Sequence, residues 1–268
     1  MKHNKLIQEI NAARVTPGHC AVWWLGQHGF AVKLGRTVCY IDAYLEPHPE
    51  RTVPPLLLPE EVTNADLVLG SHDHSDHIDR WAWPGIAMAS PKARFVVPEL
   101  LKKKAARELG IPEERFLGVD LGLSARFAGV KVSGVPAAHE LLERDRRTGL
   151  HPNLGFVVQG NGITLYHAGD TCMYEGIHAI LRQWKFDAVF LPINGRDAAR
   201  LRANCIGNMT YQEAADLAGA IRPRFTVPTH FEMFASNSAD PSLFADYVGV
   251  KYPRLAVRIP EHGRKWLL

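Results

Sequence analysis

The most constraining feature of this sequence is the segment Ser71–Asp79, which contains three histidines and three aspartates. It directly follows Asp66–Gly70, a short apolar segment that we expect to form a buried strand. Imidazoles and carboxylates packed so densely would repel one another or lack partners unless a cation joined them. The segment therefore predicts a metal site. The alternative is a polar helix cap with hydrated histidines, but H-x-H-x-D-H is far more specific than a single histidine.

The spacing within this segment predicts two sites rather than one. His72 and His74 can converge on one ion from an extended loop, whereas the adjacent Asp76 and His77 point elsewhere and can bind a second ion. Three later residues each end or follow a predicted strand, namely His139, Asp170 and His230. A histidine in such a position is more often structural when taken alone. As a set at strand ends, where rigid sheets bring loop residues together, the three are candidate ligands.

Composition limits the class of protein. The chain has 268 residues, of which 46% are hydrophobic and 22% charged, enough for a substantial core in a globular protein. A formal net charge of +3 does not favour nucleic acid as a partner. The apolar stretches are far shorter than the roughly 20 residues of a membrane span, the N-terminal residues do not form a secretory signal, and the four cysteines are widely separated. We therefore expect a cytoplasmic protein with no nucleic-acid or membrane partner.

Hydrophobic periodicity predicts two series of strands, each followed by helices. The expected strands are Ala21–Leu25, Phe30–Leu34, Thr37–Ile41, Asp66–Gly70, Arg94–Pro98, Val130–Pro136, Gly155–Gln159, Thr164–His167, Ala188–Pro192, Phe225–Pro228 and Leu255–Ile259. The expected helices are residues 3–13, a helix that carries the cations 102–104 on a solvated face, Ile177–Gln183, Thr210–Ile221 and Leu243–Val248. This order predicts an α/β fold in which two sheets pack face to face with helices outside, a four-layer αββα sandwich. We expect one domain over residues 1–268.

The segment Glu140–Asn153 is the longest without a predicted element. Its charged residues Arg144, Asp145, Arg146 and Arg147 are compatible with a solvated turn or with a cationic rim over a pocket. The segment is also the candidate for a lid, if the site has one.

The combination of His72-Asp-His-Ser-Asp-His77 with His139, Asp170 and His230 resembles the metallo-β-lactamase superfamily, whose fold is the αββα sandwich. The resemblance implies that His72, His74 and His139 hold one ion, that Asp76, His77 and His230 hold the other, and that Asp170 bridges them, with Asp76 and Asp170 as catalytic residues. It also implies that Asp42 supports the site through hydrogen bonds. Asp73 and Asp79 either orient imidazoles or cap the following helix.

Further segments resemble one branch of that superfamily, the ascorbate-6-phosphate lactonase or UlaG-like proteins. These segments are Leu25-Gly-Gln-His-Gly-Phe30, Ala137-Ala-His-Glu140, Tyr166-His-Ala-Gly-Asp-Thr171, Leu191-Pro-Ile-Asn-Gly195, Asn208-Met-Thr210 and His230-Phe-Glu-Met-Phe234. The resemblance implies a cytoplasmic hydrolase that opens a sugar-derived lactone such as L-ascorbate 6-phosphate with two Zn or Mn ions, Fe being a further option. The chain is shorter than that enzyme, so other lactones, phosphoesters and amides stay open as substrates. A phosphodiesterase and a metal-binding scaffold without turnover are the alternatives, whereas His74 argues against a flavodiiron-type oxidoreductase.

The expected mechanism needs no Ser or Cys nucleophile. Two ions about 3.5 to 4 Å apart would share a hydroxide that attacks the substrate carbonyl. His28, in a hairpin turn, and Asn194 and Arg196, after a strand, are candidate substrate contacts, with ordinary turn roles as the alternative. Cys172 is expected to be a packed residue. We expect a small-molecule substrate and a homo-oligomer.

Overall fold

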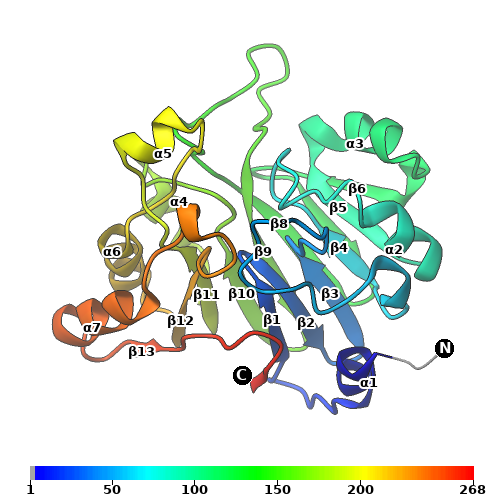
Figure 1. The fold of residues 1–268 in the computed structure, drawn as a ribbon, viewed down its shortest axis with the longest axis horizontal. Coiled ribbons are helices and arrows are strands. Elements are labelled where there is room, and N and C mark those ends of the chain that lie inside the picture. The colour runs from blue at the N-terminus through cyan, green and yellow to red at the C-terminus, as the bar shows by residue number, and fades with distance from the viewer. Residues whose placement is uncertain (1–3) are drawn as a thin grey trace.

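The computed structural model describes residues 4–268, within which two mixed seven-stranded sheets form the centre of the fold (Figure 1). The first sheet has the order β14-β1-β2-β3-β4-β5-β6, with β1 (Ala21–Gly26), β2 (Gly29–Leu34), β3 (Thr37–Ile41), β4 (Leu67–Leu69), β5 (Arg94–Pro98), β6 (Phe116–Val119) and β14 (Lys265–Leu267). The second has the order β13-β12-β11-β10-β9-β8-β7, with β7 (Ser124–Phe127), β8 (Val130–Pro136), β9 (Leu154–Gly160), β10 (Ile163–His167), β11 (Ala188–Pro192), β12 (Phe225–Thr229) and β13 (Ala256–Val257).

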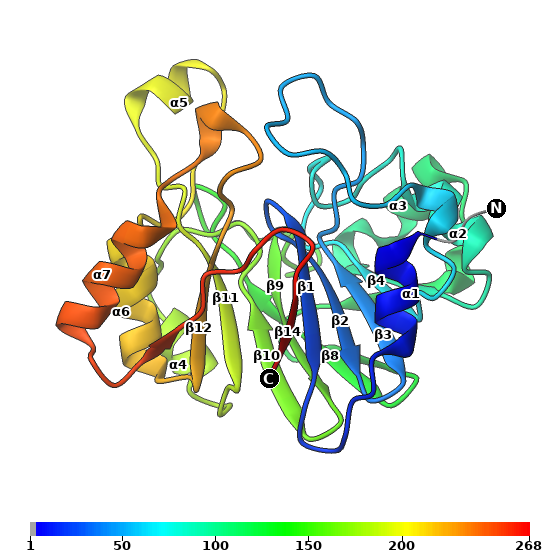
Figure 2. The ribbon, with the colours of Figure 1, turned by 60° about the horizontal axis from the view of Figure 1, so that its bottom comes forward.

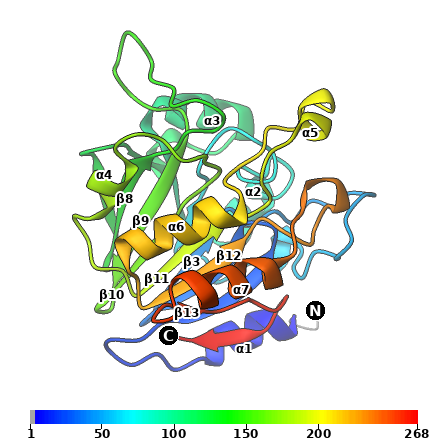
Figure 3. The same ribbon diagram turned by 90° about the vertical axis from the view of Figure 1, so that its left-hand side faces the viewer.

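Helices cover the outer face of each sheet, which confirms the predicted α/β sandwich. The helices α1 (Lys5–Ala12), α2 (Trp83–Ala89) and α3 (Lys102–Leu109) share a buried cluster with the first sheet. On the other side, α4 (Ile177–Leu181), α6 (Tyr211–Ile221) and α7 (Pro241–Lys251) pack on the second sheet (Figure 3). The short α5 (Ala198–Arg202) stands away from the sheets (Figure 2). Single 3₁₀ turns occur at η1 (Pro59–Glu61), η2 (Glu99–Leu101), η3 (Glu113–Arg115) and η4 (Ala235–Asn237).

Apolar residues explain why the sheets lie in the middle. Every residue of β1, β2 and β3 is buried, because one face packs against α1 and its neighbours and the other against the second sheet. The inner cluster contains side chains of both sheets, such as Val32 and Phe156. A core shared by both sheets is compatible with one domain over residues 1–268, which is still a prediction.

The direction of the strands brings the loops that carry the predicted metal ligands to one edge of the two sheets. The strands β3, β4 and β5 are parallel to one another, as are β10, β11 and β12. The strand β8 runs in the same direction as β10, since both are antiparallel to β9. The residues after β4, β8, β10 and β12 therefore emerge at carboxyl ends of strands, where α/β folds assemble sites.

The structure differs from the predicted elements in several places. The first residue of the predicted helix 3–13 lies outside the described residues, and α1 begins at Lys5. The helix α2, the strands β6, β7 and β14 and the short α5 were not predicted. The predicted strand Leu255–Ile259 is reduced to the two residues of β13. Among the described residues, none of the helices has the length and apolar character that a membrane crossing requires.

Candidate metal centre

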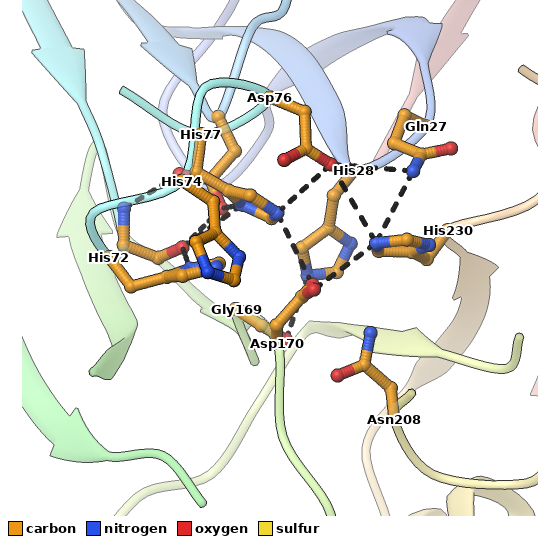
Figure 4. Close-up of polar contacts among 12 residues, drawn as sticks. Gln27, His28, His72, His74, Asp76, His77, Gly169, Asp170, Asn208 and His230 are labelled. Carbon is orange, nitrogen blue, oxygen red and sulfur yellow. Dashed lines mark hydrogen bonds and ion pairs between the residues drawn. The ribbon is translucent and has the colours of Figure 1, made fainter. Parts of the chain in front are cut away.

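The seven predicted metal ligands meet at the edge defined above, although they come from four separate loops. Figure 4 labels six of them, all except His139. The loop after β4 carries His72, His74, Asp76 and His77, whereas His139, Asp170 and His230 follow β8, β10 and β12. The backbone at the third of these loops is tightly constrained: Gly169 has φ +60°, and a Cβ there would lie 2.4 Å from the Leu154 carbonyl oxygen. Glycine is therefore required immediately before Asp170.

Three histidines form the first group of candidate ligands. One ring nitrogen from each of His72, His74 and His139 lies within 4.8 Å of the others. His139 Nε2 is 3.2 Å from His74 Nδ1. His74 is exposed, whereas His72 and His139 are buried, so this group opens to solvent on one side.

A second group combines Asp76, His77 and His230, which also lie within 4.8 Å of one another. Asp170 lies between the groups, with Oδ1 3.4 Å from His77 Nε2 and Oδ2 3.2 Å from His230 Nε2. His72, His77 and Asp170 form a further compact trio. The carboxylate of Asp170 therefore has the position that a ligand shared between two ions requires.

Asp42, at the end of β3, accepts hydrogen bonds from two residues of the histidine-rich loop. Its Oδ1 accepts from the Ser71 backbone N–H at 2.8 Å, and its Oδ2 accepts from Ser71 Oγ at 2.6 Å. The same Oδ2 lies 2.7 Å from His77 Nδ1. This contact leaves His77 Nε2 directed toward Asp170, which is how a carboxylate orients a metal-binding imidazole.

The electrostatics of the cluster indicate an excess of negative charge around His77. Burial lowers the pKa of His77, but the carboxylates of Asp170, Asp76 and Asp42 raise it well above its ordinary value. Burial alone would raise the pKa of Asp170, yet His230 and His77 hold it well below its usual range. Burial lowers the pKa of His139 to about 4, so this imidazole is neutral at physiological pH. A neutral imidazole and ionised carboxylates are the forms that bind metals.

Buried polar atoms without partners test whether a cation fits here. His72 Nε2, His77 Nε2 and Asp170 Oδ1 are all buried and have no hydrogen-bond partner among the described residues. Such atoms are rare in folded proteins because they lose hydration without compensation. The three belong to one compact trio, and all are nitrogen or oxygen donors. The donor set therefore fits a divalent cation such as Zn, Mn or Fe.

The structure adds Gln27, which the sequence did not single out. Its Nε2 lies 3.4 Å from Asp76 Oδ2 and 3.3 Å from His230 Nε2, and its backbone oxygen accepts from the His230 N–H at 2.9 Å. Gln27 has φ +51°, in the left-handed region. The only sequence signal was its place in the Gly-Gln-His-Gly turn.

His28 lies beneath the cluster, not at its rim as expected. It is fully buried, its Nε2 lies 3.0 Å from the Gly169 carbonyl oxygen, and its ring packs against His167 at 4.0 Å. A substrate contact at the rim is incompatible with this burial. His28, Asp42 and His167 are themselves close enough for an ion, but most of their donor atoms already have partners, so they form a supporting network.

The other two predicted substrate contacts have protein partners. Asn194 is buried and bonds to the amides of Asn208 and Asn237. Of these three hydrogen-bonded asparagines, Asn208 is the one whose amide faces Asp170 and His230 (Figure 4). Arg196 makes two hydrogen bonds of 2.7 Å to the Glu213 carboxylate, one to each oxygen. Arg196 nevertheless lines a cavity of about 410 Å³ beside the cluster.

The two further aspartates of the motif have structural roles. Asp79 Oδ1 accepts from the N–H groups of Trp81 and Ala82 in the turn that precedes α2, whose N-cap residue is Ala82 and not Asp79. Asp73 instead pairs with Arg80 and with Lys104, one of the three lysines expected to be solvated.

The segment after His139 protrudes as the green loop at the top of Figure 1. Asp145 accepts from Thr148, and the side chains of Arg146 and Arg147 are exposed, so the loop is an ordinary solvated turn. Of its residues only Glu140 lines the cavity beside the cluster, so its arginines do not form a cationic rim there.

Comparisons with known proteins agree with this geometry. A metal-dependent hydrolase of Sulfurisphaera tokodaii is 29% identical over 226 residues, which is 84% of this chain and 90% of that protein. One of Pyrococcus abyssi is 29% identical over 236 residues, or 86% of this chain and 92% of that protein. The structure of Igni18, a metallo hydrolase from Ignicoccus hospitalis, superposes with a TM-score of 0.74 at 22% identity, covering 93% of this chain and 98% of the other. The family described as the beta-lactamase superfamily domain matches residues 37–231, well over half of the sequence. On this match, and with its fold and clustered histidines, the chain belongs to the β-lactamase superfamily.

Proposed function

We propose that this protein is a metal-dependent hydrolase that opens lactone rings. The observation that carries the proposal is the set of buried nitrogen and oxygen atoms of His72, His77 and Asp170 that make no hydrogen bond among residues 4–268, although His77 Nε2 and Asp170 Oδ1 face each other at 3.4 Å. A fold that buries such atoms at adjacent positions is stabilised when a cation binds them. The relatives from Sulfurisphaera tokodaii and Pyrococcus abyssi are both named metal-dependent hydrolases, which supports the same reaction class.

In this proposal two divalent ions, Zn or Mn with Fe as a further option, occupy the two groups of ligands. His72, His74 and His139 would hold one ion and Asp76, His77 and His230 the other, with Asp170, which lies close to His72 and His77, as the ligand shared between the two groups. When bound, such a pair of ions supplies an acidified water and polarises an electrophilic carbonyl.

The chain's own residues hold this arrangement in place. Asp42 fixes the imidazole of His77, and the Gln27 amide lies between Asp76 and His230. His28 holds the Gly169 carbonyl and so positions the loop that carries Asp170. No protein nucleophile is needed, and the nearby Cys172 is unsuited to that role because burial raises the pKa of its thiol.

The lactone is proposed on the resemblance of several segments to the ascorbate-6-phosphate lactonase branch. The cavity of about 410 Å³ beside the cluster suits a small molecule better than a polymer. Phosphoesters and other esters or amides are the competing substrates, and a metal-binding scaffold without turnover is the competing class. Cytoplasmic location and homo-oligomerisation stay predictions.

Metal analysis combined with a substrate panel tests the proposal. The purified protein is expected to contain close to two divalent ions per chain and to hydrolyse lactones faster than phosphodiesters. Asp170→Ala is expected to lower both metal content and turnover, because it removes the carboxylate shared by the two groups. Full metal content with a normal rate in this variant would refute the assignment. Bound metal with no turnover on any substrate would favour the scaffold.

A further inference from the structure

We propose that the cavity beside the metal centre binds an uncharged, apolar part of the substrate, such as an alkyl chain, and discriminates against a phosphate group. This inference deepens the proposed function and rests on it, because it names the substrate class of the same site. It departs from the phosphorylated sugar lactone that the resemblance implies.

The cavity adjoins the ligand loops. Its wall includes Glu140, which directly follows His139, and Cys172, which lies two residues after Asp170. The Cys172 N–H donates to the Ala138 carbonyl oxygen at 2.7 Å, which holds these two loops together. A substrate with its reacting carbonyl at the cluster would therefore extend the rest of its structure into this space.

Apolar side chains form much of the cavity. Met173, Leu201 and Ile206 line it, together with the thiols of Cys172 and Cys205. Leu201, on α5, has 61% of its surface exposed, so its side chain is accessible to a substrate in the cavity. Cys172 is buried and Cys205 is partly buried, and a thiol presents only weakly polar surface to the cavity.

The charged groups of the cavity are unsuited to an anion. The guanidinium of Arg196 is bonded to both oxygens of Glu213, and Asp197 pairs with Arg200. Glu140, an exposed residue of the cavity wall, makes no side-chain hydrogen bond or ion pair among the described residues. A phosphate here would meet one unpaired carboxylate, and the charge of Arg196 is already offset by the Glu213 carboxylate. Desolvating an anion without a free cation is unfavourable.

Hydrolysis of two small series of lactones by the metal-loaded protein tests the inference. The first series is γ-hexalactone, γ-octalactone and γ-decalactone, whose side chains differ only in length. We expect kcat/KM to rise about threefold to fourfold per added CH₂ until the cavity is filled. The second is glucono-δ-lactone with its 6-phosphate, for which the phosphorylated compound is expected to be at least about tenfold poorer.

Two variants and a control assign these effects to the cavity. Leu201→Ala should lower kcat/KM for γ-decalactone roughly fivefold and leave γ-hexalactone nearly unchanged, because only the longer chain reaches α5. Leu243→Ala is the matched control, since Leu243 is an exposed leucine of α7 that does not line the cavity. Glu213→Gln releases the Arg196 guanidinium and should improve the phosphorylated lactone about tenfold relative to its partner. Glutamine keeps the hydrogen bond to the Thr210 N–H that caps α6, so folding should be retained.

A binding measurement separates failure of this inference from failure of the proposed function. Calorimetric titration with 4-hydroxyhexanoate and 4-hydroxydecanoate, the ring-opened products, requires no turnover. If no lactone is hydrolysed but the longer acid binds more tightly and Leu201→Ala removes the difference, the cavity assignment stands and the lactonase proposal fails. If lactones are hydrolysed without dependence on chain length, or the 6-phosphate is preferred, the cavity assignment is wrong and the lactonase proposal survives.

Discussion

The substitution Asp42→Asn tests whether a carboxylate outside the proposed ligand set controls the metal centre. Asp42 is fully buried and accepts from the Ser71 N–H, the Ser71 hydroxyl and His77 Nδ1 at 2.6 to 2.8 Å. Asparagine has the same shape but turns one of the two oxygens into a donor. If the amide nitrogen takes the Oδ2 position, it faces His77 Nδ1, and His77 is no longer held with Nε2 toward Asp170. If it takes the Oδ1 position, it faces the Ser71 backbone N–H, so the histidine-rich loop loses that hydrogen bond instead.

The expected magnitude follows from these contacts. A buried donor left without an acceptor costs about 1 to 3 kcal/mol. Residues that orient a metal-binding imidazole typically change metal affinity by about 10- to 100-fold when they are replaced. A tenfold change corresponds to about 1.4 kcal/mol at 25 °C, so the two estimates agree. We therefore expect Asp42→Asn to weaken the affinity for Zn²⁺ by one to two orders of magnitude.

Competition with a chromogenic chelator measures this affinity in the wild type and the variant. Asp66→Asn is the matched control, because Asp66 precedes β4 at the end opposite the cluster, and among the described residues its carboxylate accepts one hydrogen bond, from the Val38 N–H at 2.9 Å. Asparagine can accept that bond equally well, so metal affinity should not change. A change of less than about threefold in Asp42→Asn, with a folded protein, would refute the reasoning.

Three further outcomes are expected. Removal of the metals by EDTA should lower Tm by about 5 °C or more in differential scanning calorimetry, because ligand binding at 100 Kd stabilises by about 2.7 kcal/mol, and an unchanged Tm would contradict a bound cation. Asp79→Ala removes the acceptor for four backbone N–H groups, those of Leu45, Glu46, Trp81 and Ala82. The free energy of unfolding, measured by urea titration, should fall by roughly 2 to 4 kcal/mol, and a loss below about 0.5 kcal/mol would argue against these bonds. In the native protein a thiol reagent should label at most Cys205, because Cys20, Cys39 and Cys172 are buried and burial raises the pKa of Cys20 to about 12. After unfolding it should label all four cysteines, and rapid labelling of Cys20 or Cys39 in the native protein would contradict the structure.

The predicted strands were most accurate where the chain is apolar on both faces. The segments that became β1, β2 and β3 lie in the middle of the first sheet, so a run of hydrophobic residues identified them almost to the residue. The strand β7 was missed because it is an edge strand with alternating exposed residues of mixed type. The helix α2 was missed because it begins with Trp83-Pro84-Gly85, although proline is well tolerated in the first turn.

The sequence by itself determined most of the central strands and the chemistry of the cluster, because both follow from local patterns. Side chains spaced at short intervals behind a strand, and single residues at the ends of other strands, are visible without knowing how the strands pack. It also placed Asp42 correctly, through the family resemblance, beside His77.

Only the tertiary structure decided which polar groups face the cluster and which satisfy one another. Gln27 reaches His230 across 203 positions, His28 turns inward to Gly169, and Arg196 is held by Glu213. The physical reason is that each of these contacts depends on the register and packing of two sheets. A shift of one residue in a strand would reverse the direction of its side chains, and no local pattern records that choice.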